Sequence, residues 1–262
     1  MLIAPSILFA AAVALFVVGR FMARKARLIA GTEKASVSAI ESEAKAVAAE
    51  IGGGGFAKYV EVSGKIACDS PLEAEFTQTK CVHYETTVTR EYEETYVQKN
   101  SDGSSQTQTR QGTQNVSSNS RSCAFAIDDG TGKIEVDPAG AEFHLETTMS
   151  SFEPGELSRT IGTYVLNAVL AGAQGRRTIG YRFVEKCLPV DRQGYVFGEA
   201  RDSGGALRIG RSQEKGRRLI ISLKSAEELL RSAKLGAMWL TIAACASMTG
   251  ALVILVLGML RR

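Results

Sequence analysis

The longest uninterrupted apolar stretch of the chain runs from Leu235 to Leu260 and contains no Asp, Glu, Lys, Arg or His. As an α-helix rising about 1.5 Å per residue it would reach about 39 Å, more than the roughly 30 Å hydrocarbon core of a bilayer. Trp239 lies near one end, and Arg261 and Arg262 follow the other, which is typical of an aromatic belt and a charged stop. The pattern predicts a transmembrane helix; the alternative is a helix buried in a globular core.

A second uncharged stretch lies at the N-terminus, from Met1 to Gly19. A cleaved signal peptide carries basic residues before its apolar run, but here they follow it. We therefore expect an uncleaved first span, with the middle of the chain on one side of the membrane. Seven basic residues flank this middle part, against two across the bilayer, which predicts a domain that faces the cytoplasm in a plasma membrane or an organelle membrane. The seven are Arg20, Arg24, Lys25, Arg27, Lys34, Arg231 and Lys234.

Between residues 26 and 55 the sequence is rich in alanine and predicts a short helix. Apolar residues recur at spacings of three and four from Val37 to Ile51, and Ser38 with Glu41 has the spacing of a capping box. The four glycines 52–55 end this helix. They could cradle a phosphate, but no Lys-Ser/Thr pair follows and no strand precedes them, so a linker is favoured.

From residue 58 onward the apolar positions recur every second residue, which is the pattern of half-buried strands. We expect strands at 59–66, 81–97, 123–127, 134–136, 179–184, 194–198, 206–209 and 218–223. The segment Asp128–Gly132 makes a tight turn, so the strands on either side of it should form a hairpin. A calcium loop is the alternative, but its ligand spacing and closing Glu are missing.

Three segments depart from the strand pattern. Residues 98–121 contain almost no apolar side chains, which predicts a flexible polar loop. Residues 157–169 carry apolar residues at helical spacing and should form an amphipathic helix packed on the sheet. Ser225 with Glu228 forms a second capping box, and no breaker follows before Gly236, so one helix should run from the edge of the domain into the membrane.

These patterns predict an α+β membrane protein in which two transmembrane helices flank one predominantly antiparallel β domain with one or two packed helices. The expected division is a first transmembrane helix at 1–22, a juxtamembrane helix and glycine linker at 23–55, a β-rich domain at 56–224 with its loop at 98–121, and a helix continuing into the second span at 225–262.

Composition excludes some classes of function. The net charge is +3, and the basic residues lie beside the apolar stretches without interleaved aromatic residues, so no nucleic-acid partner is expected. The expected partners are the lipid bilayer and an unknown protein. Five cysteines occur without any C-x-x-C pair, so a disulfide framework or a zinc ribbon is poorly supported.

Few residues qualify for catalysis. His83 and His144 are the only histidines, and their strand neighbours of like parity are polar, so an exposed histidine is favoured over a general base. Cys81 and His83 could hold a metal together with Cys68 or Cys123, but burial in the core is the commoner fate of such cysteines. We therefore assign no catalytic, cofactor-binding or metal-binding residues, and expect no cofactor.

Several short segments follow one another in a recognisable order between the two apolar stretches. They are Gly64–Ile66, Cys81–Tyr84, Phe125–Ala141, Leu188–Pro189, Gly194–Ala200, Ile220–Ser222 and Ser225–Leu230. In this order the chain resembles, over residues 26–260, the GIDE domain, which is the beside-a-membrane (BAM) domain of mulan/MAPL-type mitochondrial E3 ubiquitin ligases and their prokaryotic relatives. The resemblance implies a β-rich domain between two spans, with the ligase chemistry in a RING finger after the second span.

The sequence stops two residues past Leu260 and holds no C-x-x-C pair for the zinc cross-brace of a RING. We therefore expect a membrane-anchored GIDE-like interaction or scaffold domain without a catalytic site of its own. The alternative is a component of an E3 ubiquitin ligase whose RING is supplied by a partner.

A third hypothesis is homo-oligomerisation through a ridge of small residues, Ala243, Ser247 and Ala251, whose four-residue spacing lets helices approach closely. Packing of the same ridge on Ala10 and Ala14 of the first apolar stretch is the alternative.

Overall fold

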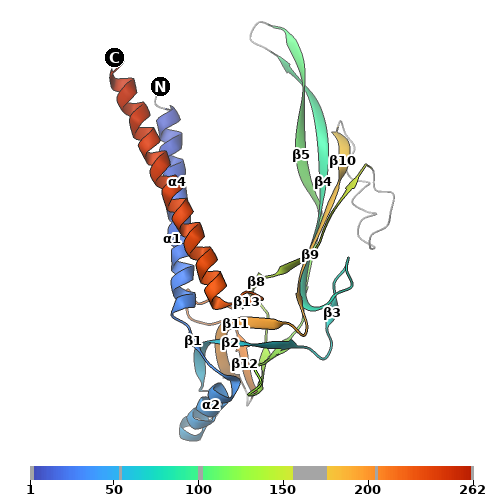
Figure 1. Ribbon diagram of the computed structural model, residues 1–262, viewed down its shortest axis with the longest axis vertical. Coiled ribbons are helices and arrows are strands. Elements are labelled where there is room, and N and C mark those ends of the chain that lie inside the picture. The colour runs from blue at the N-terminus through green and yellow to red at the C-terminus, as the bar shows by residue number, and fades with distance from the viewer. Residues whose placement is uncertain (1–2, 53–54, 100–102, 156–175, 204–205, 261–262) are drawn as a thin grey trace.

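The structure is a computed structural model that describes residues 3–52, 55–99, 103–155, 176–203 and 206–260. It contains a small barrel, a long second sheet and a pair of helices (Figure 1). In chain order the elements are α1 (Ile3–Ala30), β1 (Glu33–Lys34), α2 (Val37–Ile51), β2 (Ala57–Ala67), β3 (Leu72–Glu73), β4 (Lys80–Lys99), β5 (Ser105–Ser122), β6 (Phe125–Asp128), β7 (Lys133–Val136), β8 (Glu142–His144), β9 (Glu146–Pro154), β10 (Arg176–Pro189), β11 (Gln193–Ser203), β12 (Ala206–Gly210), β13 (Ile220–Ser222) and α4 (Ala226–Leu260).

The expectation of an α+β protein with two transmembrane helices flanking its domain is wrong. The described chain is mostly β, and within it one helical stretch, Ala226–Ile254 of α4, is long and apolar enough to cross a membrane. Among the α1 residues whose side chains the structure describes, the continuous apolar segment is Ala10–Phe21. At about 1.5 Å per residue this part reaches about 18 Å, well short of a hydrocarbon core of roughly 30 Å.

Five strands close into a barrel. β2 pairs with β6, β6 with β7, β7 with β12, β12 with β11, and β11 pairs back with β2. All of these pairs are antiparallel except β7 with β12, which is parallel. This order and this single parallel pair are those of an OB-type Greek-key barrel. Closure leaves these five strands without a free edge.

The barrel core confirms the alternation read from the sequence. The inward residues Val62, Ile127, Ile134, Val196 and Ile209 are all at most 2% exposed, and the predicted hairpin is the pair β6–β7. Burial of each such side chain stabilises the fold by roughly 1.5–3 kcal/mol. The barrel is therefore the main hydrophobic core of the protein.

Helix α2 covers one end of the barrel, with Val37 and Ile40 buried in the same core. Its N-cap is Ser36, whose Oγ accepts from the Ala39 amide at 3.3 Å. The capping box expected at Ser38 is therefore two residues out of register. A second fastening comes from the β6–β7 turn, where Asp129 Oδ2 accepts from the Val37 amide at 2.8 Å.

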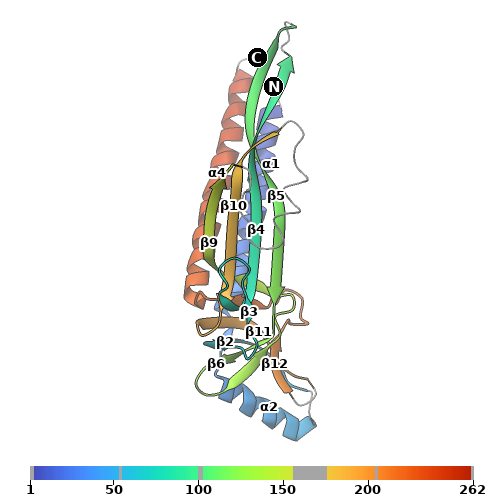
Figure 2. The same ribbon diagram turned by 90° about the vertical axis from the view of Figure 1, so that its right-hand side faces the viewer.

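The second sheet extends from the barrel and has β4 at its centre. β10 pairs with one side of β4, and β3 and β5 pair with the other side. β9 pairs with the far side of β10. The flexible polar loop expected at 98–121 is absent, because Ser105–Ser122 forms the strand β5, paired with β4 along its whole length. The apolar pattern did not predict this strand, because it buries little apolar surface and is held mainly by backbone hydrogen bonds to β4. The β4–β5 hairpin projects far from the barrel (Figures 1 and 2).

The helices α1 and α4 pack along each other (Figures 1 and 2). They are in contact at Gly19, where an added Cβ would lie 3.6 Å from Leu240 Cβ. The capping box at the start of α4 is confirmed, because the Glu228 amide donates to Ser225 Oγ and the Ser225 amide donates to Glu228 Oε2. The helix expected at 157–169 lies outside the described residues.

Candidate functional site

The largest exposed apolar surface of the described chain lies on the two long helices. On α4, Trp239, Ile242 and Leu252 are between 50% and 65% exposed, and on α1 Phe16 and Val17 are more than half exposed. Monomeric soluble proteins rarely expose a contiguous surface of this kind. Its chemistry fits lipid chains or apolar helices.

Of the three small residues expected to form a ridge on α4, the structure describes the side chains of Ala243 and Ser247, and neither is fully buried. Ala244 is buried at 5%, whereas Ala243 is exposed and Ser247 is half-buried. Among the described side chains of α1, the buried small residues are Ala12 and Gly19, while Ala10 and Ala14 are exposed. The described positions therefore do not support packing of the ridge on Ala10 and Ala14.

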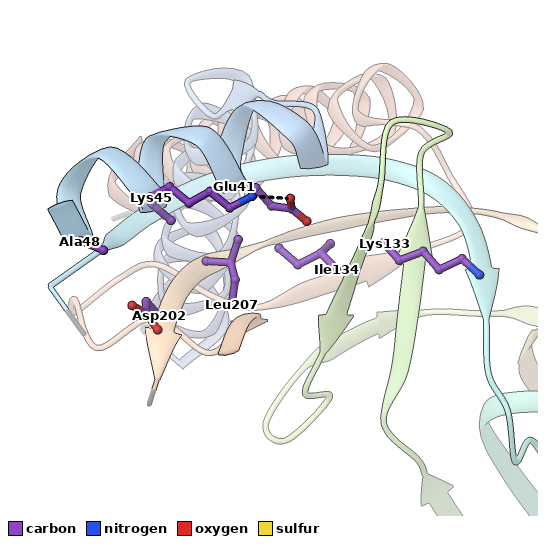
Figure 3. A pocket seen from close by; sticks show the side chains of 8 residues that line it. Glu41, Lys45, Ala48, Lys133, Ile134, Asp202 and Leu207 are labelled. Atoms are coloured by element: carbon purple, nitrogen blue, oxygen red, sulfur yellow. Dashed lines mark ion pairs between the residues drawn. The ribbon is translucent and has the colours of Figure 1, made fainter. Parts of the chain in front are cut away.

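A groove of about 500 Å³ lies between α2 and the barrel wall, a volume within the range of ligand pockets (Figure 3). Ile134 and Leu207 form its apolar floor, and Glu41 and Lys45 of α2 lie above them, joined by an ion pair of 3.6 Å. Asp202 lies at one end of the groove. An apolar floor with a charged rim can take an apolar side chain flanked by polar groups.

A second pocket, of about 520 Å³, is lined by charged residues at the end of β12, among them Arg208 and Arg211. Its innermost charge is Glu199, 6% exposed, which accepts from Ser212 Oγ at 2.5 Å and pairs with Arg201. Burial alone would raise the pKa of Glu199, but the hydrogen bonds from Ser212 and Arg201 outweigh burial and lower it. The carboxylate therefore stays charged, and its partners are Ser212 and Arg201 of the protein itself.

His83 is buried, contrary to the expectation of an exposed histidine. It is 2% exposed, its ring stacks on Phe143 with centroids 3.6 Å apart, and its Nδ1 lies 2.8 Å from Ser122 Oγ. Phe143 belongs to β8, a strand of the other sheet, so a contact between the two sheets buries this histidine. Burial lowers the pKa of His83, although Glu85 at 3.5 Å opposes this effect.

The four cysteines of the β domain form two pairs. Cys81 and Cys187 are fully buried in one small cluster, which confirms Cys81 as a core cysteine. Cys68 and Cys123 are half-buried, with their Sγ atoms 3.8 Å apart. Within the described residues no three His, Cys, Asp or Glu side chains lie close enough together to hold a metal ion.

The sequence did not point to the two pockets or to the thiol pair. The helical spacing of Glu41 and Lys45 is typical of a solvated helix face, which gave no indication of a groove. Cys68 and Cys123 are 55 positions apart, so the sequence did not indicate that they are neighbours. The pairing of β2 with β6 brings the two cysteines together, and the packing of α2 on the barrel places Glu41 and Lys45 over the groove floor. The alternation in β7 and β12 was a signal for the groove floor, because it marks Ile134 as inward-facing.

Comparison with known proteins adds the family. The chain is similar to the E3 ubiquitin-protein ligase SPL1 of Arabidopsis thaliana, with 33% identity over 91 residues, 34% of this chain and 25% of the relative. The chain thus matches about a quarter of the length of that relative. No solved structure matches. The GIDE family, described as E3 ubiquitin ligase, matches residues 93–258, well over half of the chain, and the protein therefore belongs to the GIDE family.

Proposed function

We propose that this protein is a membrane-anchored interaction module that presents a stiff β arm to a protein partner and has no ligase chemistry of its own. The arm is the part of the β4–β5 hairpin farthest from the barrel, residues 91–99 and 105–114. The observation that carries the proposal is that this arm is ordered into paired strands although it contributes almost nothing to a core.

The arm is stabilised by contacts on its surface. The Glu94 carboxylate forms ion pairs with Arg110 at 2.7 Å and with Arg176 at 3.3 Å. The Arg176 guanidinium also lies 4.7 Å from the centre of the Tyr92 ring. Isolated two-stranded ribbons are marginally stable in water, and each exposed ion pair adds at most about 1 kcal/mol. An arm of this length therefore adds little to the stability of the domain, which favours a role in binding.

Site-specific photocrosslinking tests the role of the arm. A photoreactive amino acid at Thr109, with the full chain in native membranes, is expected to give discrete adducts with a partner protein. The same amino acid at Asp69, an exposed position outside the arm, is the matched control. Equal adducts from both positions, or adducts from Asp69 alone, would contradict the proposal.

We propose that α4 anchors the protein in a membrane and that the barrel lies on the cytoplasmic side. The exposed apolar residues of α4 end near Leu235, and the basic residues Arg231 and Lys234 come directly before it on the barrel side. The protein should resist alkaline extraction from membranes. A cysteine introduced as Gln106→Cys should react with an impermeant maleimide only after the cells are permeabilised, and extra labelling of intact cells relative to the parent chain would reverse the orientation.

The alternative function is that of a component of an E3 ubiquitin ligase, which the family description favours. In that case the chain would recruit or orient a RING protein. A reconstituted assay with activating enzyme, conjugating enzyme and ubiquitin separates the two functions. Conjugates formed by the chain alone would overturn the non-catalytic proposal, whereas conjugates that need an added RING protein would support the alternative.

We also propose a second candidate partner, another copy of this chain bound through the face of α4 that carries Ala243 and Ser247. Close helix packing needs small side chains, so Ala243→Leu with Ser247→Leu should weaken such a dimer. Crosslinking in membranes, with Cys245→Ser as the matched control on the same helix, measures this effect.

A further inference from the structure

We propose that Cys68 and Cys123 form a redox site. A low-molecular-weight disulfide such as oxidised glutathione oxidises the two thiols to an intramolecular disulfide. This inference goes beyond the proposed function and does not depend on it. It rests on the geometry of the two thiols and on their position in the fold.

The two thiols are placed to react with each other. Their Sγ atoms are 3.8 Å apart, and a disulfide bond of about 2 Å needs only small rotations of the two side chains. Each thiol lies at hydrogen-bonding distance from a backbone carbonyl, Cys68 Sγ from Ala124 O at 3.5 Å and Cys123 Sγ from Val82 O at 3.6 Å. Both cysteines are half-buried, so a small oxidant can reach them.

The other cysteines of the described chain do not share this combination. Cys81 and Cys187 are adjacent but both fully buried, so a soluble oxidant has no access to them in the folded protein. Cys245 lies in α4, with no described cysteine beside it. Reaction with a soluble oxidant should therefore select Cys68 and Cys123.

The pair sits where the chain leaves the barrel and returns to it. Cys68 directly follows β2 of the barrel, and Cys123 lies between β5 of the second sheet and β6 of the barrel. A bond between them would close the excursion that contains β3, β4 and β5 at its base. Oxidation would thereby fix the attachment of the arm to the barrel.

The chemistry proceeds in two exchange steps. The Cys68 thiolate attacks one sulfur of oxidised glutathione, forming a mixed disulfide and releasing one glutathione. Cys123 then loses its proton and attacks Cys68 Sγ, releasing the second glutathione. Two protein thiols are oxidised, one glutathione disulfide is reduced, and the two protons pass to the released thiols.

The order of the steps follows from the surroundings of the two thiols. Burial and the hydrogen bond with Cys68 raise the pKa of Cys123 to about 11, so Cys123 is a poor first nucleophile at neutral pH. In a reducing compartment such a disulfide is transient, as is typical of redox-sensing pairs. The oxidised form should therefore accumulate only when the glutathione pool is oxidised.

Peptide mapping tests the proposal directly. The full chain in detergent is incubated with oxidised or reduced glutathione, alkylated and digested with trypsin, which places each cysteine of the β domain in its own peptide: 66–80, 81–90, 122–133 and 187–192. We expect a disulfide-linked pair of peptides 66–80 and 122–133 after oxidation, and its loss after reduction. Closing a loop of this length should also raise Tm by about 5–15 °C.

The variants define what would overturn the proposal. Cys68→Ser and Cys123→Ser should each abolish the linked pair and the Tm shift, whereas Cys245→Ser should retain both. Glutathione stably attached to Cys68 without a link, a link between peptides 81–90 and 187–192 alone, or an intermolecular link would each refute it. The peptide mapping of the unmodified chain decides the outcome, so the test remains valid even where a serine variant fails to fold.

Discussion

Buried polar side chains lie where one part of this fold joins another. Glu185 of β10 is fully buried, and its carboxylate accepts from the Phe76 amide at 2.6 Å, from Thr77 Oγ1 at 2.5 Å and from Thr148 Oγ1 at 3.0 Å. These bonds hold the turn before β4 and the strand β9 on β10. Removal of such an acceptor leaves buried donors unpaired, which costs about 1–3 kcal/mol for each.

His83 gives the stability of the protein a pH dependence. Its folded pKa lies below the usual 6.5, because burial between Ser122 and Phe143 disfavours the charged form more than Glu85 favours it. The unfolded chain therefore binds the proton more readily, so this contribution to stability is complete above about pH 6.5 and is lost as the pH falls below it. We expect Tm to drop between pH 7.5 and 5.5.

The matched variant is His83→Phe, which keeps an aromatic ring on Phe143 but cannot titrate. Its Tm should be lower at pH 7.5, because Ser122 loses its partner, and should change less between the two pH values than that of the parent chain. Thermal unfolding followed by circular dichroism measures both. Identical pH dependence in the two proteins would show that another group is responsible.

Ile134 tests the orientation of the β6–β7 hairpin. Its side chain is 2% exposed in the barrel core, so Ile134→Asp removes roughly 1.5–3 kcal/mol of apolar burial and forces a carboxylate into the core. With a total stability of about 5–15 kcal/mol, this substitution should unfold the domain or lower its Tm steeply. Glu135→Gln, one residue on, loses only an exposed ion pair with Arg208 and should cost less than about 1 kcal/mol. Equal losses would contradict the orientation.

At the scale of elements, α2 depends on a side chain distant in sequence. Asp129 accepts from the Val37 amide with Oδ2 and from the Thr131 and Gly132 amides with Oδ1, so one carboxylate joins the β6–β7 turn to the N-terminus of α2. Partial burial alone would raise the pKa of Asp129, but these bonds lower it. The stabilisation is therefore present at neutral pH and is lost as the pH falls through that lowered pKa.

We expect Asp129→Ala to lower the free energy of unfolding by about 1–2 kcal/mol at neutral pH, the usual cost of losing a helix cap. Asp69→Ala, at an exposed position, should have little effect. Urea denaturation in detergent measures both variants. A loss confined to Asp69→Ala, or none in either, would mean that the turn does not fasten the helix.

The β4–β5 hairpin has two parts that should respond differently to deletion. Near the barrel, Val116 packs against the cluster of Val88, Tyr181 and Phe183, and Asn119 donates to Glu75. Farther out, from Thr95 and its partner Thr109 to the tip, the strands contribute no buried core residue. Replacing residues 96–108 by a two-residue Asn-Gly turn should therefore leave Tm within a few degrees of the parent.

Removal of residues 98–120 should instead lower the free energy of unfolding by at least about 1–2 kcal/mol, since it takes Val116 out of its cluster and leaves the β4 edge unpaired near the barrel. Calorimetry of the two deletions gives the comparison. If both deletions left Tm unchanged, the hairpin would be dispensable along its whole length.

Sequence periodicity could predict the strands of the barrel but not their closure. Positions such as Ile127, Ile134 and Val196 alternate because one face of each strand is buried, and this signal survives in any packing. β5 gave no such signal, since most of its Gln, Thr and Ser side chains face water and pairing with the backbone of β4 sets most of its structure. His83 was misread for a related reason, because the strand that buries it, β8, is distant in sequence.

At the scale of the molecule, two long excursions between barrel strands build the second sheet. The chain between β2 and β6 supplies β3, β4 and β5, and the chain between β7 and β11 supplies β9 and β10. Figures 1 and 2 show that this sheet and the helix pair rise on the same side of the barrel and reach similar heights. The barrel is therefore the common base of two projections of opposite chemistry.

This arrangement has a consequence when α4 lies in a bilayer. Twenty residues of helix beyond Lys234 cover the roughly 30 Å hydrocarbon core, a depth that the polar hairpin cannot share, because an open strand edge leaves unpaired backbone groups that cost several kcal/mol each in lipid. Between β13 and α4 lie only Leu223, Lys224 and Ser225. This short connection is where the two projections must diverge.

We therefore expect the hairpin to stand in water while α4 stands in lipid. Spin labels on cysteines introduced as Gln106→Cys and Val253→Cys, each in the full chain reconstituted into nanodiscs, report depth through their collision with dissolved oxygen and with a water-soluble nickel complex. The label at 106 should be accessible to nickel, and the label at 253 mainly to oxygen. The parent chain, labelled in parallel, corrects for the native cysteines. Oxygen-dominated relaxation at both positions would place the arm in the hydrocarbon and contradict its assignment as a partner-binding surface. Nickel accessibility at both positions would show that α4 does not lie in the membrane.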